Sequence, residues 1–267
     1  MFGRSLVVGQ YIPIDSPIHR LDPRAKIIFV GVAIIELFLI KGWLAFLLVG
    51  IMVGSLVSLA HVPFGYLLRS LKPILFLLVL TLVLHIFFTP GEYVYERGFI
   101  HISMAGLQRG IFIVVRLCLL IMVTSLLTLT TSPVELTDGI EYLLSPFKRW
   151  GFPAHELAMM MTIAIRFIPT LLEEADRIMK AQKARGMDFE SGNFIQRARN
   201  LVPLLVPLFI NSFKRADELA IAMESRCYRG GEGRTRLRVL IMTFYDCLFL
   251  VVSLSLFTVI TVGSYFW

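Results

Sequence analysis

The stretch that decides the fold is IFIVVRLCLLIMVTSLLTLTT at residues 111–131, in which Arg116 is the single charged side chain. An α-helix needs about 20 mostly apolar residues to cross the hydrocarbon core of a bilayer. This stretch is long and apolar enough, so it predicts a membrane-spanning helix.

Four other apolar runs lie on either side of it, at residues 27–40, 43–60, 73–89 and 240–266. Hydrophobic residues make up 57% of the 267-residue chain and charged residues only 17%, against about 25% charged in ordinary soluble domains. A water-soluble fold of this length could not bury so much apolar surface in its core. The sequence therefore predicts an all-α, polytopic membrane protein with about five transmembrane helices.

Residues 132–238 differ from the rest, because they hold 16 of the 26 basic and 13 of the 19 acidic residues. Two long amphipathic helices are predicted there, at 154–184 and roughly 196–225, after a shorter helix at 133–150. The first would be about 46 Å long, which exceeds the thickness of a membrane. Each long helix is apolar in its first half and charged in its second. Such a helix can lie along the membrane or under the protein and then project into water, and it is a poor membrane span. We therefore expect three regions: four spans in 1–131, a cytoplasmic domain in 132–238 and a last span in 239–267.

The distribution of positive charge predicts the orientation of the chain. Six Lys or Arg residues lie in the N-terminal segment and the 61–72 loop, against three in the first hairpin and the 90–110 loop. Cytoplasmic loops carry this excess, so the N-terminus and residues 132–238 are predicted to be cytoplasmic and the C-terminus external. The net charge of +7 fits segments beside an anionic membrane surface better than a nucleic-acid partner.

A weak internal repeat relates the two long predicted helices. A shift of 41 positions superimposes Ala175-Asp176 on Ala216-Asp217, Ala181 on Ala222 and Arg185 on Arg226. Each arginine is expected at a helix end, with Gly186 ending the first helix and Gly230-Gly231 the second.

The helix dipole alone favours a cation at a helix C-terminus, by a few tenths to about 1 kcal/mol. It does not explain why both arginines stand between small residues, Ala184 and Gly186 in one case and Ser225 and Cys227 in the other. Small neighbours let a partner approach the backbone closely, and a guanidinium offers five donors in a rigid fork. The repeat therefore indicates two docking points on one cytoplasmic face.

With these residues in view, nearly the whole chain resembles the transmembrane T subunit of energy-coupling factor (ECF) transporters, the vitamin and metal-ion importers of prokaryotes. The resemblance rests on DSPIHRLDPR at 15–24, IRFIP at 165–169, and the signatures Ala184-Arg185-Gly186 and Ser225-Arg226-Cys227. It implies that the chain lies in the membrane of a prokaryotic cell. It also implies that Arg185 and Arg226 each dock one cytoplasmic ABC-type ATPase. The second signature is more often Ala-Arg-Gly, but its flanking residues here stay small.

The resemblance also implies that the apolar halves of the long helices carry a small membrane-embedded substrate-binding subunit. The residues expected to form this platform are Met159, Met160, Ile163, Leu204 and Leu208. Methionine suits an interface that repacks, although on an apolar helix it is more often core or lipid-facing filler. Pro169, Pro203 and Pro207 are expected to bend these helices.

Four polar residues lie in or near the apolar runs: Glu36, His85, Arg116 and Asp246. Such groups are expensive in a membrane and often functional, so a proton or ion pathway is one interpretation. Because no span carries two spaced carboxylates, we favour the interpretation that they hold helices together.

The sequence contains no P-loop, HExxH, GxSxG or Cys/His cluster, so we expect a non-catalytic chain without its own cofactor or metal. ATP and Mg would be bound by the partner ATPases, and the substrate would be a vitamin or another micronutrient chosen by the substrate-binding subunit. Two alternatives stay open, a permease subunit of a conventional ABC importer and a membrane-bound enzyme. Permease subunits of conventional ABC importers carry a Glu-Ala-Ala loop with a Gly four residues later. Glu174-Ala175-Asp176 lacks both the second Ala and that Gly.

Overall fold

The protein is described from a computed structural model, which covers residues 11–90, 93–97, 100–189, 191, 193–230 and 240–266. These residues divide into two compact units, one formed by 11–143 with 240–266 and the other by 144–230. The region boundaries expected at 131 and 238 stay predictions, and residues 238 and 239 lie outside the described part of the chain.

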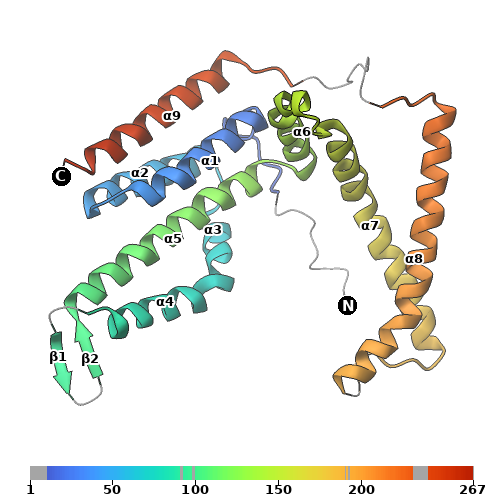
Figure 1. Cartoon of the computed structure of the whole chain (residues 1–267), viewed down its shortest axis with the longest axis horizontal. Helices are drawn as coiled ribbons and strands as arrows, with labels where there is room; N and C mark the ends of the chain where they lie inside the picture. The colour runs from blue at the N-terminus through green and yellow to red at the C-terminus, as the bar shows by residue number, and fades with distance from the viewer. Residues whose placement is uncertain are drawn as a thin grey trace. The chain divides into compact units, whose positions relative to one another are not determined.

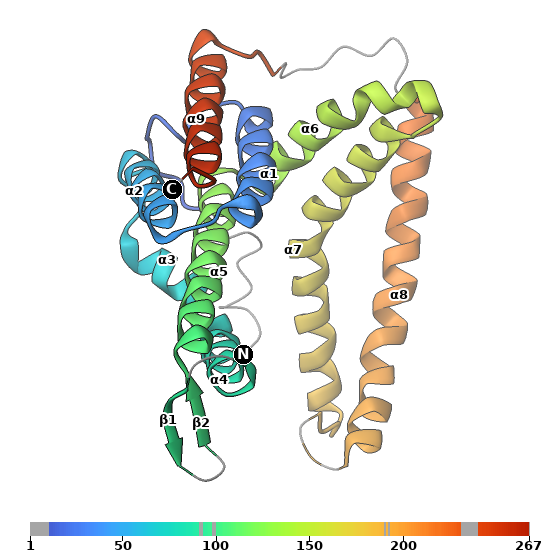
Figure 2. The same cartoon turned by 60° about the vertical axis from the view of Figure 1, so that its left-hand side comes forward.

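The first unit is mostly helical (Figures 1 and 2). Its elements are α1 Pro23–Leu39, α2 Trp43–Leu59, α3 Phe64–Leu71, a 3₁₀ turn Lys72–Ile74, α4 Leu75–Phe88, β1 Tyr93–Arg97, β2 Ile100–Ser103, α5 Met104–Thr130, α6 Pro133–Leu144 and α9 Phe244–Gly263. The antiparallel hairpin β1–β2 is the one departure from an all-helical fold among the described residues. The predicted helix at 133–150 ends at Leu144 and continues as a 3₁₀ turn, Ser145–Trp150, in which Pro146 takes the first turn.

The five predicted apolar runs fall on α1, α2, α4, α5 and α9. Among the described residues, four helices are long and apolar enough to cross a membrane: Phe64–Phe88, α5, α9 and the first long helix of the second unit, Ala154–Ala184. The candidate span therefore begins earlier than the run predicted at 73–89, because the 3₁₀ turn Lys72–Ile74 connects α3 directly to α4. Ala154–Ala184 is the least apolar of the four, and its expected position outside the membrane stays a prediction.

The core of the first unit lies among α1, α2, α5 and α9, which pack on one another. Small and β-branched side chains line these contacts, and Phe257 of α9 is fully buried against Phe29 of α1. Since lipid tails are as apolar as leucine, packing of this kind and interhelical hydrogen bonds hold membrane helices together.

The helix α4 packs on α5 through a GxxxG motif, Gly106 and Gly110, that our sequence interpretation did not use. A methyl group at Gly106 would overlap the backbone carbonyl oxygen of His85, and one at Gly110 would press on Leu82. The glycines therefore permit the close approach of the two helices. The His85 ring stays within α4, with Nδ1 2.9 Å from the Thr81 carbonyl oxygen.

We predict that Gly106→Ala destabilises the protein by about 1–3 kcal/mol, because the backbones of α4 and α5 would have to separate. Gly54→Ala is the matched control, since a methyl group at Gly54 meets nothing within 4 Å. Thermal unfolding of both purified variants checks this. Equal melting temperatures for the two variants would show that the glycine is not needed for the contact.

Two carboxylates close the starts of α1 and α9 and join them. Asp22 caps α1 by accepting from the Arg24 backbone N–H at 2.9 Å, and its own backbone N–H donates to Asp246 at 2.8 Å. The second oxygen of Asp246 accepts from the Thr243 N–H at 2.7 Å, which closes the first turn of α9. Both carboxylates are buried, so their hydrogen bonds satisfy groups that have no access to water.

Two buried cations extend this cluster to α5 and α6. The Arg24 guanidinium donates to the Leu240 carbonyl oxygen at 2.6 Å and stacks on the Tyr142 ring of α6 at 3.5 Å. The Lys26 ammonium donates to the carbonyl oxygen of Thr130, which ends α5, at 3.0 Å. Residues of the DSPIHRLDPR segment at 15–24, together with Lys26, therefore join α1, α5, α6 and α9 at one end of the unit.

Glu36 and Arg116 also connect helices. Glu36 accepts hydrogen bonds from the hydroxyls of Thr258 at 3.0 Å and Thr261 at 3.4 Å, both on α9. Arg116 of α5 donates to the Ile40 carbonyl oxygen at the end of α1, at 3.1 Å. Three phenylalanine rings surround its guanidinium within 6 Å, those of Phe38, Phe46 and Phe112. These contacts favour the structural interpretation of the polar residues over an ion pathway.

Candidate functional site

The second unit is built on two long helices, α7 Ala154–Ala184 and α8 Phe194–Ser225, with the 3₁₀ turn Ser145–Trp150 packed on α7. The expected range of α7 is confirmed, and α8 begins two residues before the expected Gln196. Asn193 explains that start, because its side chain accepts from the first turn while the Gln196 side chain accepts from the Asn193 N–H. This reciprocal capping box fixes the N-terminus of α8.

The two helices pair in antiparallel directions (Figures 1 and 2). Glu174 of α7 accepts from Asn211 Nδ2 at 3.0 Å and from Arg215 Nη2 at 3.4 Å, two residues one turn apart on α8. Further along α7, Gln182 Nε2 donates to the Pro203 carbonyl oxygen at 3.4 Å. As α7 advances, its partners therefore lie at decreasing residue numbers on α8.

The Gln182 contact has a local cause in the proline content of α8. Pro203 and Pro207 both lie inside the helix, as expected. Since Pro207 has no N–H, the carbonyl oxygen of Pro203 loses its partner within the helix. Gln182 supplies a replacement donor from α7, so a group that the sequence leaves unpaired becomes an interhelical contact.

The first predicted docking arginine ends α7 in a defined turn. Arg185 is the C-cap residue, and the N–H of Gly186 donates to the Lys183 carbonyl oxygen at 3.0 Å. The N–H of Met187 donates to the Gln182 carbonyl oxygen, also at 3.0 Å. This pair of hydrogen bonds is the Schellman motif, with the left-handed residue directly after the cap.

The second predicted docking arginine ends α8 in the same way. Arg226 is the C-cap residue, the N–H of Cys227 donates to the Glu224 carbonyl oxygen at 2.8 Å, and the N–H of Tyr228 donates to Met223 at 3.0 Å. Each hydrogen bond has its counterpart at the same spacing from Arg185. The weak sequence repeat therefore corresponds to a repeated backbone structure.

The residue after each arginine adopts a positive φ, +86° at Gly186 and +56° at Cys227. Glycine takes this conformation without strain, whereas a residue with a Cβ carries a cost of about 1 kcal/mol or more. Gly186 ends its helix as expected, but the expectation that Gly230-Gly231 ends the second helix is wrong. The helix ends at Ser225 with Cys227 in the left-handed turn, and Gly231 lies outside the described residues.

Both arginines are exposed, as are Ala184, Gly186, Ser225 and Cys227 beside them. The antiparallel pairing places the two turns at opposite ends of the helix pair. From Pro203, which lies opposite Gln182, about 35 Å of helix leads to Arg226 at 1.5 Å per residue. The two turns are therefore too far apart to enter a single groove, which is compatible with the predicted pair of docking points.

The expected platform residues differ in exposure. Met160 is exposed, Met159, Ile163 and Leu208 are half-buried, and Leu204 is buried. Leu204 therefore supports the helix pair and offers little surface to a partner. A more exposed apolar stripe lies on α8, where Val202, Val206, Phe209 and Phe213 follow helical spacing and are each at least half exposed. This stripe lies within the apolar half of α8 that was expected to carry the platform, although these four residues were not singled out.

No group of three or more His, Cys, Asp or Glu side chains that could hold a metal ion occurs in the described part of the chain. An open cavity on α8 is lined by Lys214, Arg215 and Glu218 together with Phe167 of α7. At the two turns, the exposed functional groups are the guanidinium donors of Arg185 and Arg226 at the helix ends.

We predict that Gly186→Ala destabilises the first turn by about 1 kcal/mol, which corresponds to roughly fivefold faster amide exchange at Met187. Cys227→Ala is the matched control, because position 227 already carries a Cβ in the left-handed conformation. Hydrogen exchange of the purified chain measures both turns. Equal acceleration by the two substitutions would contradict the assigned turn geometry.

Comparisons with known proteins agree over most of the chain. Residues 15–237 match the family described as CbiQ, cobalt transport protein. The energy-coupling factor transporter transmembrane protein EcfT of Thermosediminibacter oceani is 57% identical over 243 residues, 91% of this chain and 92% of that protein. The protein of the same name from Acidaminococcus fermentans is 54% identical over 258 residues, 96% of this chain and 95% of its own length. The EcfT protein of Bacillus subtilis is 50% identical over 243 residues, with coverage of 91% and 92%.

Proposed function

The chain belongs to the EcfT family of transmembrane proteins of energy-coupling factor transporters, and we propose that its arginine turns dock two ATPases. As a member of this family it is a multi-pass membrane protein and the non-catalytic coupling subunit of its transporter. The proposal assigns one ATPase to the turn of Ala184, Arg185 and Gly186, and the other to the turn of Ser225, Arg226 and Cys227.

The repeated turn is the observation that carries this proposal. Two helix ends with the same hydrogen bonds expose one arginine each, as expected if each meets the same groove on one of two like subunits. The small flanking residues leave the backbone accessible, and the guanidinium offers several donors to carbonyl or carboxylate groups. Two separated turns suit two partners better than one.

The contacts between α7 and α8 support a mechanical role. When ATP binding draws two ATPases together, forces at Arg185 and Arg226 act on opposite ends of α7 and α8. The Glu174 contacts with Asn211 and Arg215 connect the two helices between these ends. Closure would therefore tilt the pair as a unit. ATP and Mg belong to the ATPases in this scheme, and the chain itself carries no cofactor.

The apolar surface of the helix pair is the proposed platform for a small membrane-embedded substrate-binding subunit. Met160 of α7 and the α8 stripe with Phe209 and Phe213 are exposed, whereas Met159, Ile163 and Leu208 are half-buried. Motion of the pair would reorient the subunit resting on it. Vitamins or other micronutrients are the proposed substrates, with the choice made by that subunit.

The proposed topology places the N-terminus and residues 132–238 in the cytoplasm of a prokaryotic cell, with the C-terminus external. The excess of Lys and Arg on the assigned cytoplasmic segments supports it. A conventional ABC permease fits less well, because Glu174 and Ala175 lie inside a helix that pairs with α8 and form no exposed coupling loop.

Affinity co-purification from native membranes tests the docking proposal. We predict that Arg185→Ala with Arg226→Ala removes most of the ATPase, and that each single substitution weakens docking less. Loss of charged hydrogen bonds costs about 1.5–3 kcal/mol per arginine, or roughly 10–100-fold in affinity.

The matched control is Arg177→Ala with Lys214→Ala, which removes two exposed cations from within α7 and α8, about 12 and 18 Å along their helices from the arginine turns. This variant should retain both ATPases and the substrate-binding subunit. The proposal fails if the control loses the ATPases equally, or if the wild-type chain purifies without them.

A further inference from the structure

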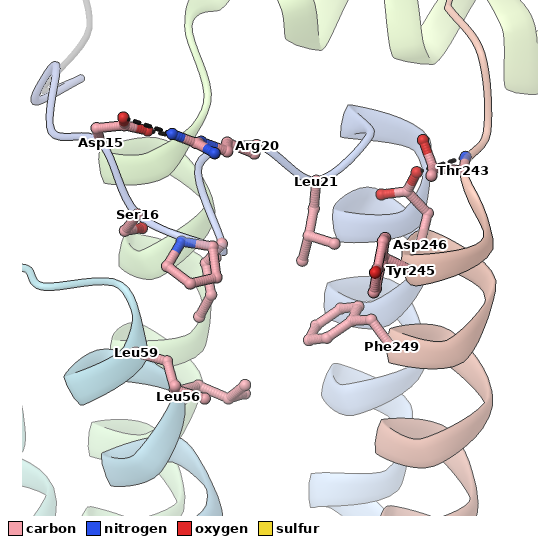
Figure 3. A pocket seen from close by; sticks show the side chains of 12 residues that line it. Asp15, Ser16, Arg20, Leu21, Leu56, Leu59, Thr243, Tyr245, Asp246 and Phe249 are labelled. Atoms are coloured by element: carbon pink, nitrogen blue, oxygen red, sulfur yellow. Dashed lines mark hydrogen bonds and ion pairs between the residues drawn. The ribbon is translucent and has the colours of Figure 1, made fainter.

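A cavity of about 670 Å³ opens in the first unit where the segment before α1 meets the end of α2 and the start of α9 (Figure 3). Its volume falls within the range of small-molecule sites, about 300–1,000 Å³. It lies apart from both arginine turns in the chain, and none of the contacts assigned to docking involves its lining residues.

The deeper walls of the cavity are apolar. Leu56 and Leu59 approach from α2, and Phe249 approaches from α9 on the opposite side with Leu21 beside it (Figure 3). The outer faces of these helices carry exposed apolar residues, including Leu47 on α2 and Val252 on α9. In a membrane such faces meet lipid, so the apolar part of the cavity continues into a lipid-facing surface.

The rim carries one pair of opposite charges. The Arg20 guanidinium donates to Asp15 through Nε at 2.8 Å and Nη2 at 2.7 Å. Both side chains are 74% exposed, and the hydrogen bonds and charge of Arg20 lower the pKa of Asp15 below its ordinary value. Exposed ion pairs contribute little to stability, so each member can exchange its partner for a ligand group.

The other carboxylate in the lining is already occupied. Asp246 accepts from the backbone N–H groups of Asp22 and Thr243. The charges left at the mouth are therefore one anion and one cation a few ångströms apart. This pattern is complementary to a ligand that also carries one of each.

We propose that the cavity binds one bilayer phospholipid with a zwitterionic headgroup. The ammonium group would lie at Asp15 and the phosphate at Arg20, while the start of one acyl chain lies between Leu59 and Phe249. The cavity would hold the headgroup and the first part of that chain, with the remainder in the bilayer. A soluble anion fits the site less well, because it would use the guanidinium and leave the carboxylate and the apolar walls without partners.

Native mass spectrometry of the detergent-washed transporter complex tests the proposal, with synthetic phosphatidylethanolamine and phosphatidylglycerol as competing probes. The wild type should retain one phosphatidylethanolamine after the other lipids are washed away. Leu59→Trp, which fills the cavity, should lower the retained fraction by about tenfold. Leu47→Trp, the same change on the lipid-facing side of the same helix, should leave it unchanged.

A second variant separates headgroup recognition from acyl binding. Asp15→Asn with Arg20→Gln changes only exposed side chains, so it should fold normally and lose the preference for phosphatidylethanolamine. The proposal is overturned if no lipid is retained or if both tryptophan variants retain it equally. It is also overturned if phosphatidylglycerol is preferred, or if the headgroup variant keeps the wild-type preference.

Discussion

The antiparallel pairing of α7 and α8 is the constraint on which the function of this molecule depends. Glu174 binds Asn211 and Arg215, and Gln182 satisfies the carbonyl group that Pro207 leaves unpaired. Because the helices run in opposite directions, their C-terminal turns lie at opposite ends of the pair. A parallel pair would bring Arg185 and Arg226 together and offer one docking point in place of two.

The two turns show how a weak sequence repeat can encode a stronger structural one. Only a few residues match at a spacing of 41, yet the capping hydrogen bonds correspond one for one. A cation at a helix C-terminus also interacts favourably with the helix dipole. The same position that stabilises each helix therefore presents the guanidinium to a partner. The chain belongs to the EcfT family, and in the proposed docking this dual use would give the subunit two fixed points of attachment.

Hydropathy and helical periodicity predicted the membrane-spanning character and the range of α7, because both depend on local composition. Contacts between distant residues could not be predicted in that way. Asp22 and Asp246 are 224 positions apart, and no local pattern indicates that they meet. The end of α8 at Ser225 was predicted, but the residue that stops it was not, because Cys227 takes a left-handed conformation that glycine usually signals. Leu204 was expected on a surface because an apolar helix does not reveal which side its neighbour covers. The GxxxG motif of Gly106 and Gly110 can be read from the sequence. The sequence does not show that α4 is the helix that packs on it.

The separation of the two arginine turns is the central claim, and a distance measurement tests it most directly. Spin labels at Ala184→Cys and Ser225→Cys, in a chain whose native cysteines are replaced by serine, would report the distance by pulsed electron paramagnetic resonance. The antiparallel pair predicts a distribution centred at about 35 Å or more, from 1.5 Å of rise per residue. A distribution centred below about 20 Å would be shorter than the length of helix that separates the turns in an antiparallel pair. Such a result would contradict both the pairing and the two-point docking that follows from it.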